Sequence, residues 1–541
     1  MNKIWIEKYK KEILGKFENK IDVALENYNE LHLFLKNAQD IPEICNYIYG
    51  NLGTRLTTVI CTDERKLGNG FVIRHVFGKE NGEDVFIFVT SKIDESILSY
   101  PSIAMAIPAA TLHEREIHDM FGIIPIDNPD TRPLVLHDHW DKNIFPLRKD
   151  FGLNTKIPRQ EREYPFLKVQ GEGICEIPVG PVHAGIIEPG HFRFSVMGEN
   201  IINLETRLFY AHKGIEKLAE SMKIDDVLLL SERIAGDESI ANSTAFCQSI
   251  EKIASVTIPK RAQQIRTIFG ELERLYNHMG SLAGISMDVG FPFGSSRLNI
   301  LKERLMKLNE SLSGSRILFG VNRIGGVRCN ITDESKKIIT ESMDFILSDF
   351  ENIVTLLKSK SSFIDRLKDT GIIPKRAAQD LGLVGVAARC IGIDVDTRRD
   401  HPYSSYLLHK KETPHEVMQR EISMQKRNGD VLTRFEVRVQ EVLESFDIIR
   451  ASLNLENDSL YVNRPQNLEP FRSALGYTES HRGQTVHWVM TGENNSIFRY
   501  KVRTASFFNW PIIEQSVLND IVPDFPLVNK SLDLSYSGND L

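Results

Sequence analysis

The stretch Ser231–Ser243 reads SERIAGDESIANS, and the chain closes on SLDLSYSGNDL, which spans Ser531–Leu541. Both stretches are rich in hydroxyl and carboxylate side chains and contain no cysteine. The six cysteines stand elsewhere, and no two of them lie within three residues of each other: Cys45, Cys61, Cys175, Cys247, Cys329 and Cys390. Because this spacing excludes a local CxxC motif, we expect single buried thiols and no iron–sulfur cluster held by this chain.

The composition is typical of a globular protein, with 41% hydrophobic and 26% charged residues among 541. This length suggests more than one domain. A net charge of −7 gives no basic footprint, so nucleic acid is not an expected partner. The sequence holds no run of 18 apolar residues, which predicts that no helix spans a membrane. Neither a Rossmann glycine motif nor a P-loop is present, so binding of NAD or ATP by those means is not expected.

The first part of the chain, residues 1–152, combines helical and strand patterns. Apolar residues at helical spacing predict one or two helices over Trp5–Asn29. Three β-like runs follow, separated by the turn-rich segments GNG and ENGED: Leu56–Cys61, Phe71–Phe77 and Asp84–Thr90. A helix is then expected over Ala109–Phe121, with Gly122 as its C-cap. Strands followed by a helix predict a small α+β domain.

The expected helix contains TLHEREIHDMFGI, which resembles a zinc-protease motif at first sight. His113 and His118 are five residues apart, which places them ~140° apart around a helix. A zinc protease needs the two histidines four residues apart, so a zinc hydrolase is not predicted. The charged residues of this helix are predicted to form a polar face that docks on a neighbour: His113, Glu114, Glu116, His118 and Asp119.

Residues 153–165 are polar and lack apolar periodicity, so they are predicted to be a linker. Residues 171–210 alternate apolar and polar side chains around Gly and Pro turns, which favours strands. Helical periodicity then predicts six helices: Ile202–Met222, Ile250–Ser255, Arg261–Leu282, Asn299–Arg316, Asp333–Lys360 and His415–Leu453. The expected architecture is therefore α+β, with a large mainly helical domain over residues 166–541.

Several motifs recur in the order and spacing of a known family. They are GPVHAGIIEPGHFRF (Gly180–Phe194), LFYAHKGIEKLAE (Leu208–Glu220), KRAQQIRTIFGELERLYNHM (Lys260–Met279), DVDTRRDHPY (Asp394–Tyr403), RGQTVHWVMTG (Arg482–Gly492), FFNWP (Phe507–Pro511) and SLDLSYSGNDL. The chain resembles the large subunit of formate hydrogenlyase and hydrogenase-4, which are group 4 membrane-bound nickel–iron hydrogenases. That family fuses a domain like the 30 kDa subunit of respiratory complex I to one like the 49 kDa subunit. The segments IHDMFGI, HDHW and FPLRKDF are similar to the 30 kDa subunit, which has no redox centre.

The resemblance implies a metal site that this sequence has lost. In the family, two Cys-x-x-Cys pairs hold nickel and iron, and the matching positions here are Ala235, Glu238, Ser535 and Gly538. Nickel–iron chemistry needs soft thiolate donors, which a methyl group, a carboxylate, a hydroxyl and a hydrogen atom do not replace. We therefore predict that the nickel–iron centre is absent and that this chain binds no cofactor directly. The resemblance places an iron–sulfur cluster in a separate small subunit.

The same resemblance marks ionisable residues beside that site. Glu188 matches a carboxylate that relays protons, and burial there would raise its pKa into a range suited to proton exchange. The alternative is a structural carboxylate that caps a turn. Asp396, Arg398 and Asp400 match a segment that lines the cavity, and the alternative for them is a structural cluster of ion pairs.

Three further residues are assigned by the resemblance. Glu238 either extends the proton path from Glu188 or pairs with Arg398. Arg233 and His278 match positions near the iron–sulfur cluster of the partner subunit.

In the 49 kDa subunit of complex I, a His and a Tyr hydrogen-bond the quinone. The matching positions here are near Pro189 and at Phe246, whose rings donate no proton. Direct quinone chemistry of that kind is therefore not favoured, although a quinone-reducing subunit stays among the alternatives.

The resemblance implies a peripheral subunit of a membrane-bound complex I-like oxidoreductase that couples electron transfer to ion translocation. The expected partners are an iron–sulfur small subunit and antiporter-like membrane subunits, and the expected location is the cytoplasmic face of the inner membrane. A non-catalytic scaffold of the same complex is the main alternative.

Overall fold

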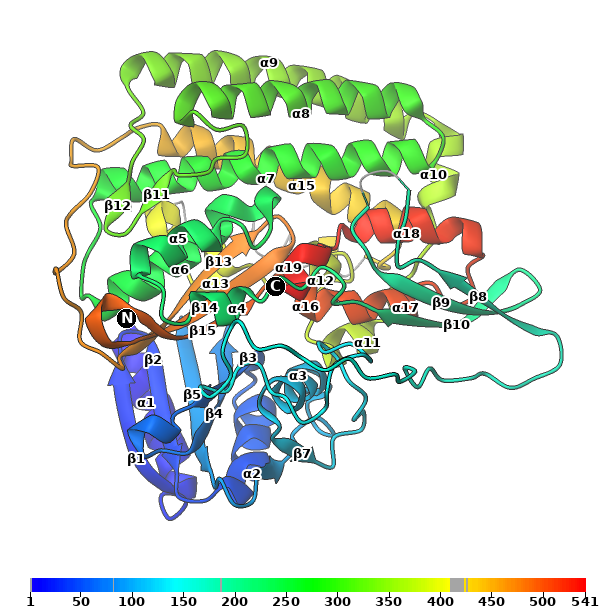
Figure 1. The fold of residues 1–541 in the computed structure, drawn as a ribbon. Helices are drawn as coiled ribbons and strands as arrows, with labels where there is room; N and C mark the ends of the chain where they lie inside the picture. Colours follow the sequence, from blue (N-terminus) through cyan, green and yellow to red (C-terminus); the bar gives the residue numbers. More distant parts are fainter. Residues whose placement is uncertain (1, 81, 185–186, 409–422, 425–426) are drawn as a thin grey trace.

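The computed structural model describes residues 2–80, 82–184, 187–408, 423–424 and 427–541. In Figure 1 the N-terminal part lies at the bottom and a stack of long helices lies at the top. A small sheet lies between them, and a second small sheet projects to the right. The C-terminus lies near the centre, where these layers meet (Figure 1).

A five-stranded sheet forms the centre of the N-terminal part, with the strand order β1-β2-β5-β4-β3. Its strands are β1 (Ile21–Asn27), β2 (Glu30–Leu35), β3 (Arg55–Asp63), β4 (Phe71–Lys79) and β5 (Val85–Ile93). Strands β2 and β5 pair in parallel, and the other neighbours are antiparallel. The remaining elements are α1 (Asn2–Phe17), α2 (Ile41–Asn46), β6 (Ser99–Pro101), α3 (Thr111–Phe121) and β7 (Ile124–Ile126). The three predicted strands and the predicted helix ending at Gly122 are confirmed.

The helix predicted over Trp5–Asn29 is correct only for its first part. Helix α1 ends at Phe17, and the edge strand β1 follows. Ile21 and Leu25 continue the helical spacing of α1, but only Ile21 is buried on β1. This segment forms a strand because β1 pairs with β2 in a hairpin. The turn of the hairpin lies at Tyr28, whose φ of 52° is in the left-handed region.

Beyond residue 165 the chain forms two antiparallel three-stranded sheets and a layer of long helices. The sheets are β8 (Ile174–Val179), β9 (His191–Met197) and β10 (Asn200–Arg207), then β13 (Ser473–Ser480), β14 (Gly483–Thr491) and β15 (Ile497–Arg503). The long helices are α6 (Ser239–Ile253), α7 (Lys260–Asp288), α8 (Pro292–Ser313), α9 (Asp333–Lys358) and α15 (Val431–Ser452). The shorter elements are α4 (Ile215–Ala219), α5 (Ile224–Ser231), β11 (Asn322–Arg323), β12 (Gly326–Val327), α10 (Ser361–Leu367), α11 (Lys375–Asp380), α12 (Gly385–Arg389), α13 (Thr397–Asp400), α16 (Ala505–Asn509), α17 (Ile513–Ser516), α18 (Phe525–Leu532) and α19 (Tyr536–Asp540).

Most of the predicted long helices are present. The patterns that begin at Arg261, Asn299 and Asp333 correspond to α7, α8 and α9. In α9 the apolar residues at helical spacing face α8. Of the six predicted there, Leu347 is partly buried and five are buried: Ile339, Met343, Ile346, Phe350 and Val354.

Three helix predictions need correction. The helix predicted over Ile202–Met222 is wrong, because its first residues belong to β10, which pairs with β9, and only Ile215–Ala219 is helical. The segment Ile250–Ser255 overlaps only the end of α6. The helix predicted over His415–Leu453 begins at Val431 in the structure, and residues 415–422 lie outside the described residues.

The two parts of the chain share a hydrophobic core. Phe86 and Phe88 of the N-terminal sheet are fully buried against Leu475 and Trp488 of the sheet β13-β14-β15. The predicted linker over residues 153–165 contains no helix or strand. The joint between the parts is therefore a packed core beside a segment of irregular chain, and we expect the two parts to unfold together.

A truncation at this joint tests that expectation. Replacing Phe86 by alanine is expected to lower the free energy of unfolding by about 3–5 kcal/mol, because it opens a cavity between the two sheets. Chemical denaturation followed by circular dichroism measures the loss. Val23→Ala is the matched control, because Val23 is 41% exposed on β1 and should change stability by less than about 0.5 kcal/mol. An equally small loss for Phe86→Ala would contradict a shared core.

The polar face of α3 docks within the same chain. Glu116 pairs with Lys501 of β15 at 2.7 Å. Asp119 accepts hydrogen bonds from the backbone amides of Leu134 and Val135. Within the described residues, no helix combines the length and the apolar character needed to cross a bilayer.

Candidate functional site

The four positions that the resemblance assigned to metal ligands are gathered from two distant segments. Ala235 and Glu238 lie in the turn between α5 and α6, while Ser535 and Gly538 lie at the start of α19. The Oε2 atom of Glu238 is 3.5 Å from the place where a Cβ on Gly538 would stand. Ala235 belongs to the same turn, because its carbonyl accepts the Glu238 N–H at 3.0 Å. We call these four residues the socket.

Local hydrogen bonds explain how the socket forms. Ser535 caps α19, and its Oγ accepts the Gly538 N–H at 2.9 Å. A Cβ on Gly538 would lie 2.9 Å from that same Oγ, so a side chain at this position would displace the cap. Trp510 donates from its indole to the Ser535 carbonyl at 3.0 Å, which fixes the segment against α16.

Glu238 faces Arg482 and His481. Its side chain is 1% exposed, and its Oε1 lies 3.5 Å from Nη1 of Arg482 and 4.0 Å from Nδ1 of His481. The predicted pairing of Glu238 with Arg398 is therefore wrong. Arg482 is the residue that sequence reasoning missed, although it opens the motif RGQTVHWVMTG in the turn between β13 and β14.

Two aspartates complete the surroundings of Arg482. Asp237 lies 2.7 Å from its Nη2, and Asp533 lies 3.8 Å away. Burial alone would raise the pKa of Asp533, but Arg482 and the His481 imidazole, 3.4 Å away, hold that pKa well below its usual range. The pKa of Asp237 is lowered in the same way by Arg482. The site is therefore held together by one arginine that compensates several carboxylates.

Glu273 shows the opposite behaviour. It reaches from α7 to the start of α6, where it accepts the N–H groups of Ile240 at 2.7 Å and Ala241 at 3.0 Å. Burial raises the pKa of Glu273 to about 8, although the two amides lower it; the nearby charges of Glu238 and Asp237 raise it by smaller amounts. Glu273 thus positions the turn that carries Glu238.

The raised pKa of Glu273 predicts a pH effect on stability. In the folded state Glu273 keeps its proton up to about pH 8, whereas the unfolded chain loses it near 4.5. The folded state therefore binds more protons over this window, so the contribution of Glu273 to stability falls as the pH rises from about 4.5 to about 8 and is constant above. Glu273→Gln should remove this trend. Thermal unfolding of both proteins from pH 5 to 8.5 measures it, and parallel pH profiles would contradict the prediction.

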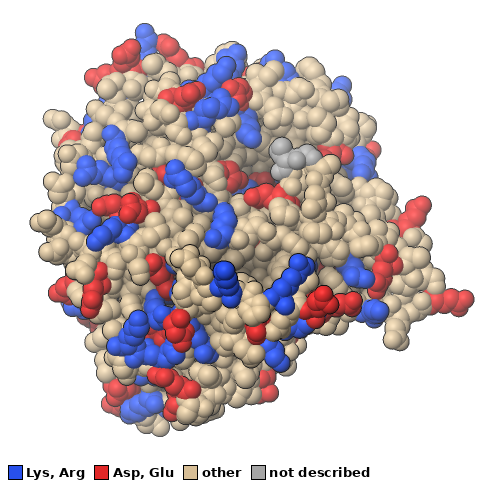
Figure 2. Space-filling view, viewed as in Figure 1, with Lys and Arg blue, Asp and Glu red and all other residues tan. Residues whose placement is uncertain are grey.

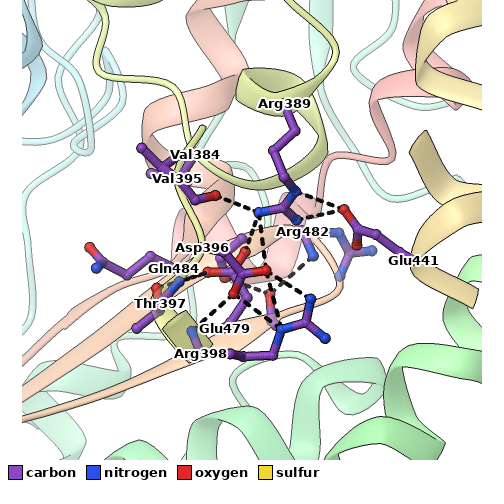
Figure 3. A network of polar contacts seen from close by, with 12 residues as sticks. Val384, Arg389, Val395, Asp396, Thr397, Arg398, Glu441, Glu479, Arg482 and Gln484 are labelled. Atoms are coloured by element: carbon purple, nitrogen blue, oxygen red, sulfur yellow. Dashed lines mark hydrogen bonds and ion pairs between the residues drawn. The ribbon is translucent and has the colours of Figure 1, made fainter. Parts of the chain in front are cut away.

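Buried charged residues form a network near the socket, and Figure 3 shows the part of it that includes Arg389, Glu441 and Glu479. Glu441 of α15 lies 2.6 Å from Arg274 and 2.7 Å from Arg389, with Nε2 of His278 at 3.0 Å. Burial opposes ionisation of Glu441, but Arg389 and Arg274 hold its pKa well below the usual range. Arg389 also contacts Glu479 at 2.8 Å. These buried ion pairs link α7, α12, α15 and β13.

Asp396, Arg398 and Asp400 of the motif DVDTRRD belong to the same network of buried charges. Arg398 pairs with Asp396 at 2.7 Å and with Glu271 at 3.2 Å. Asp400 instead pairs with Arg399 at 3.1 Å and accepts the Asp396 N–H at 2.9 Å. Asp396 and Arg398 therefore pair with each other, whereas the side chain of Asp400 turns toward Arg399.

Glu188 is near the socket but is only half-buried. Its Oε2 accepts the Ser537 N–H of α19 at 3.0 Å, which is the contact that a capping carboxylate makes. The desolvation expected for Glu188 is thus incomplete, and its proton-relay role stays a prediction.

The two residues expected to face a partner's cluster are not together on the surface. His278 is fully buried against Glu441, whereas the side chain of Arg233 is 54% exposed and lies over the ring of Phe319. Of these two residues, Arg233 is the exposed one.

The remaining alternatives are placed as follows. His113 is buried against Phe507 and Phe508, while the side chain of His118 is 44% exposed. Phe246 is buried against Tyr500, and Pro189 is half-buried. Within the described residues, no group of three or more His, Cys, Asp and Glu side chains is placed to hold a metal ion.

The donor set at the socket does not fit a nickel–iron centre. Glu238 offers a hard carboxylate that faces a guanidinium, and the Ser535 hydroxyl is engaged in capping α19. Ala235 and Gly538 offer no donor atom in their side chains. Nickel and low-valent iron require soft sulfur ligands, so these residues do not supply the coordination that the family uses.

Comparison with known proteins identifies the family. The profile described as respiratory-chain NADH dehydrogenase, 49 Kd subunit, matches residues 298–474, and that of the 30 Kd subunit matches residues 35–156. Formate hydrogenlyase subunit 5 of Escherichia coli (strain K12) is 35% identical over 526 residues, which cover 96% of this chain and 90% of that protein. Hydrogenase-4 component G of the same strain is 34% identical and covers 92% of this chain and 86% of that protein.

A solved structure supports the fold. A chain of the membrane-bound sulfane sulfur reductase, an archaeal respiratory membrane complex, superposes with a TM-score of 0.63 at 23% identity, covering 68% of this chain and 99% of that one. The resemblance inferred from the motifs is thus confirmed. This chain belongs to the family of formate hydrogenlyase subunit 5 and hydrogenase-4 component G, in which parts like the 30 kDa and 49 kDa subunits of the respiratory-chain NADH dehydrogenase are joined.

Proposed function

We propose that this chain is the large peripheral subunit of a membrane-bound oxidoreductase complex that couples electron transfer to ion translocation, and that its socket handles protons instead of holding nickel and iron. The family relationship supports the setting, because its relatives are subunits of membrane-bound hydrogenases and of NADH-quinone oxidoreductases. The observation that carries the proposal is the buried carboxylate of Glu238, which stands beside Gly538 and faces Arg482.

The chemistry of the socket suits proton handling. Among the described residues, the carboxylate oxygens of Glu238 and the ring nitrogens of His481 are buried and make no hydrogen bond of good geometry, although Arg482 lies 3.5 Å from Glu238 and Asp533 lies 3.4 Å from His481. Such groups are satisfied by ordered water when the site has room for it, and water between a carboxylate and an imidazole passes protons. From His481 the charged groups continue through Asp533 on one side and, across the ring of His278, to Glu441 on the other.

The partners and the location follow from the same proposal. An iron–sulfur small subunit would dock over the exposed Arg233, and antiporter-like membrane subunits would bind the ion-translocating side. The chain would then lie at the cytoplasmic face of the inner membrane. This chain itself would bind no nickel–iron centre, and the electron carriers would belong to the partners.

A structural scaffold is the second candidate, and one observation favours it. Ser535 and Glu188 both use their side chains to cap α19, so part of the polar lining is committed to holding the fold. In a pure scaffold the charge of Glu238 would serve only to balance Arg482.

The intact complex, purified through a tag on this chain, tests both candidates. We expect no stoichiometric nickel and no hydrogen evolution, together with electron transfer from a redox donor coupled to ion uptake in sealed vesicles. Glu238→Gln should reduce the coupled ion uptake by about tenfold or more, because an amide does not accept and release protons as the carboxylate would. Glu436→Gln is the matched control, since Glu436 is 53% exposed on α15. Unchanged ion uptake in Glu238→Gln would favour the scaffold, and stoichiometric nickel would overturn the proposal.

A further inference from the structure

A cavity of about 370 Å³ lies where three segments of the chain meet. One wall comes from the end of the N-terminal part and includes Leu136, Trp140 and Phe151. The second wall is the segment leading into α4, with Phe209 and Lys213, and the third is formed by the last residues of the chain. This volume and its aromatic lining are typical of sites for small apolar molecules.

Three charged groups that line this cavity have a partner of opposite charge, while Asp540 accepts the Ala211 N–H at 2.9 Å and burial raises its pKa to about 6. Glu116 pairs with Lys501, and Glu216 pairs with Arg499 at 2.8 Å. Lys217 contacts Glu220 at 3.1 Å. These groups have their charges balanced by the chain itself and do not require a charged ligand.

Lys213 differs from them. Its ammonium donates to the backbone carbonyls of Ile234 at 2.6 Å and Arg233 at 3.3 Å. Among the residues that the structure describes, no carboxylate lies within 4.0 Å of it, and burial lowers its pKa, although the more distant Glu188 and Asp540 act in the opposite direction. An ammonium held only by neutral carbonyls at the edge of an apolar cavity attracts an anionic group.

We propose that this cavity binds a small planar apolar anion, whose rings lie among Trp140, Phe151 and Phe209 and whose charged group contacts Lys213. Aromatic walls favour a planar ring system through stacked and edge-to-face contacts. This binding site is separate from the socket and does not depend on the proton-handling role proposed for Glu238.

An adjoining cavity provides an internal comparison. It has a volume of about 260 Å³ and shares Phe209 with the first cavity. Arg132 contacts Asp130 at 2.9 Å there and also pairs with Glu205, whereas Arg207 donates to the backbone carbonyls of Pro133 and Leu134. Arg207 is 3% exposed and its guanidinium lies over the ring of Tyr164, whereas Lys213 is exposed, so the anion should reach the ammonium of the first cavity and not this guanidinium.

The purified full-length chain tests the proposal with two probes of the same shape. 8-Anilinonaphthalene-1-sulfonate carries the anion, and N-phenyl-1-naphthylamine is its neutral analogue. We expect the sulfonate to bind with one site per chain in calorimetry and to accept excitation energy from Trp140. Leu136→Trp, which fills the cavity, should weaken binding by about tenfold or more. Leu381→Trp in the adjoining cavity is the matched control and should leave binding unchanged.

A second substitution tests the role of the charge. Lys213→Met should weaken binding of the sulfonate by up to about fivefold while binding of the neutral probe stays unchanged. Lys223→Met, at an exposed lysine at the start of α5, should affect neither probe. Binding of several probes per chain, or binding that Leu136→Trp leaves intact, would overturn the site. Equal losses of both probes in Lys213→Met would overturn the contact between the anion and the ammonium.

Discussion

Replacing Glu441 by glutamine is expected to lower the free energy of unfolding by about 3–5 kcal/mol, because the amide keeps the shape of the side chain but removes its charge. Arg274 and Arg389, whose side chains are only 2% and 7% exposed, would then lose the carboxylate that they share. The desolvation of both guanidinium groups has already been incurred on folding, and Glu271 at 3.4 Å from Arg274 and Glu479 at 2.8 Å from Arg389 would offset it only in part. Chemical denaturation followed by tryptophan fluorescence measures the loss.

The matched control for this experiment lies on the same helix. Glu436 is also a glutamate of α15, but it is 53% exposed and 3.9 Å from Lys358. Glu436→Gln should change stability by less than about 1 kcal/mol, because exposed ion pairs contribute little. If both variants lost the same small amount, the buried charges would not stabilise the fold in the way that their geometry indicates.

Replacing Arg482 by methionine is expected to lower the free energy of unfolding by about 3–5 kcal/mol near neutral pH. This substitution removes the cation that compensates Asp237, Glu238 and Asp533, so that the carboxylates repel one another in a buried site. Arg472→Met is the matched control, because Arg472 and its partner Glu469 are 67% and 72% exposed. A loss as small as that of the control would show that Arg482 does not hold the socket together.

The loss of unfolding free energy in Arg482→Met should also depend on pH. In the native protein the folded-state pKa of Asp533 and of Asp237 lies below the unfolded value of 3.8. Their contribution to stability is therefore present above pH 3.8 and is lost as the pH falls through the folded-state values. Arg482→Met removes this contribution, so the difference between the two proteins should be largest above about pH 4 and should shrink in more acidic solution. Denaturation at pH 3.5 and pH 7 measures it, and an equal difference at both values would contradict the assignment.

Sequence reasoning located the socket because its flanks carry dense motifs. Ala235 and Glu238 precede Ser535 and Gly538 by 300 residues, yet the structure brings Glu238 against Gly538. Sequence reasoning did not find the partners of Glu238, since Arg482 and His481 come from a third segment. A usable signal was present in α7, where Glu271, Arg274 and His278 recur at helical spacing inside an otherwise buried helix. Buried charges on one helix face require compensation, so this stripe indicates a polar core.

The amino-acid sequence by itself determined the family, the α+β character, and the long helices α7, α8 and α9, because helical periodicity and short motifs are local properties of the chain. Only the tertiary structure decided which charges meet. Glu238 faces Arg482, Asp400 turns to Arg399, and the strand β10 replaces a predicted helix, since each of these outcomes depends on segments far apart in sequence. Strand pairing and charge compensation are interactions between segments, and their energies exist only when folding has placed the partners within a few ångströms of each other.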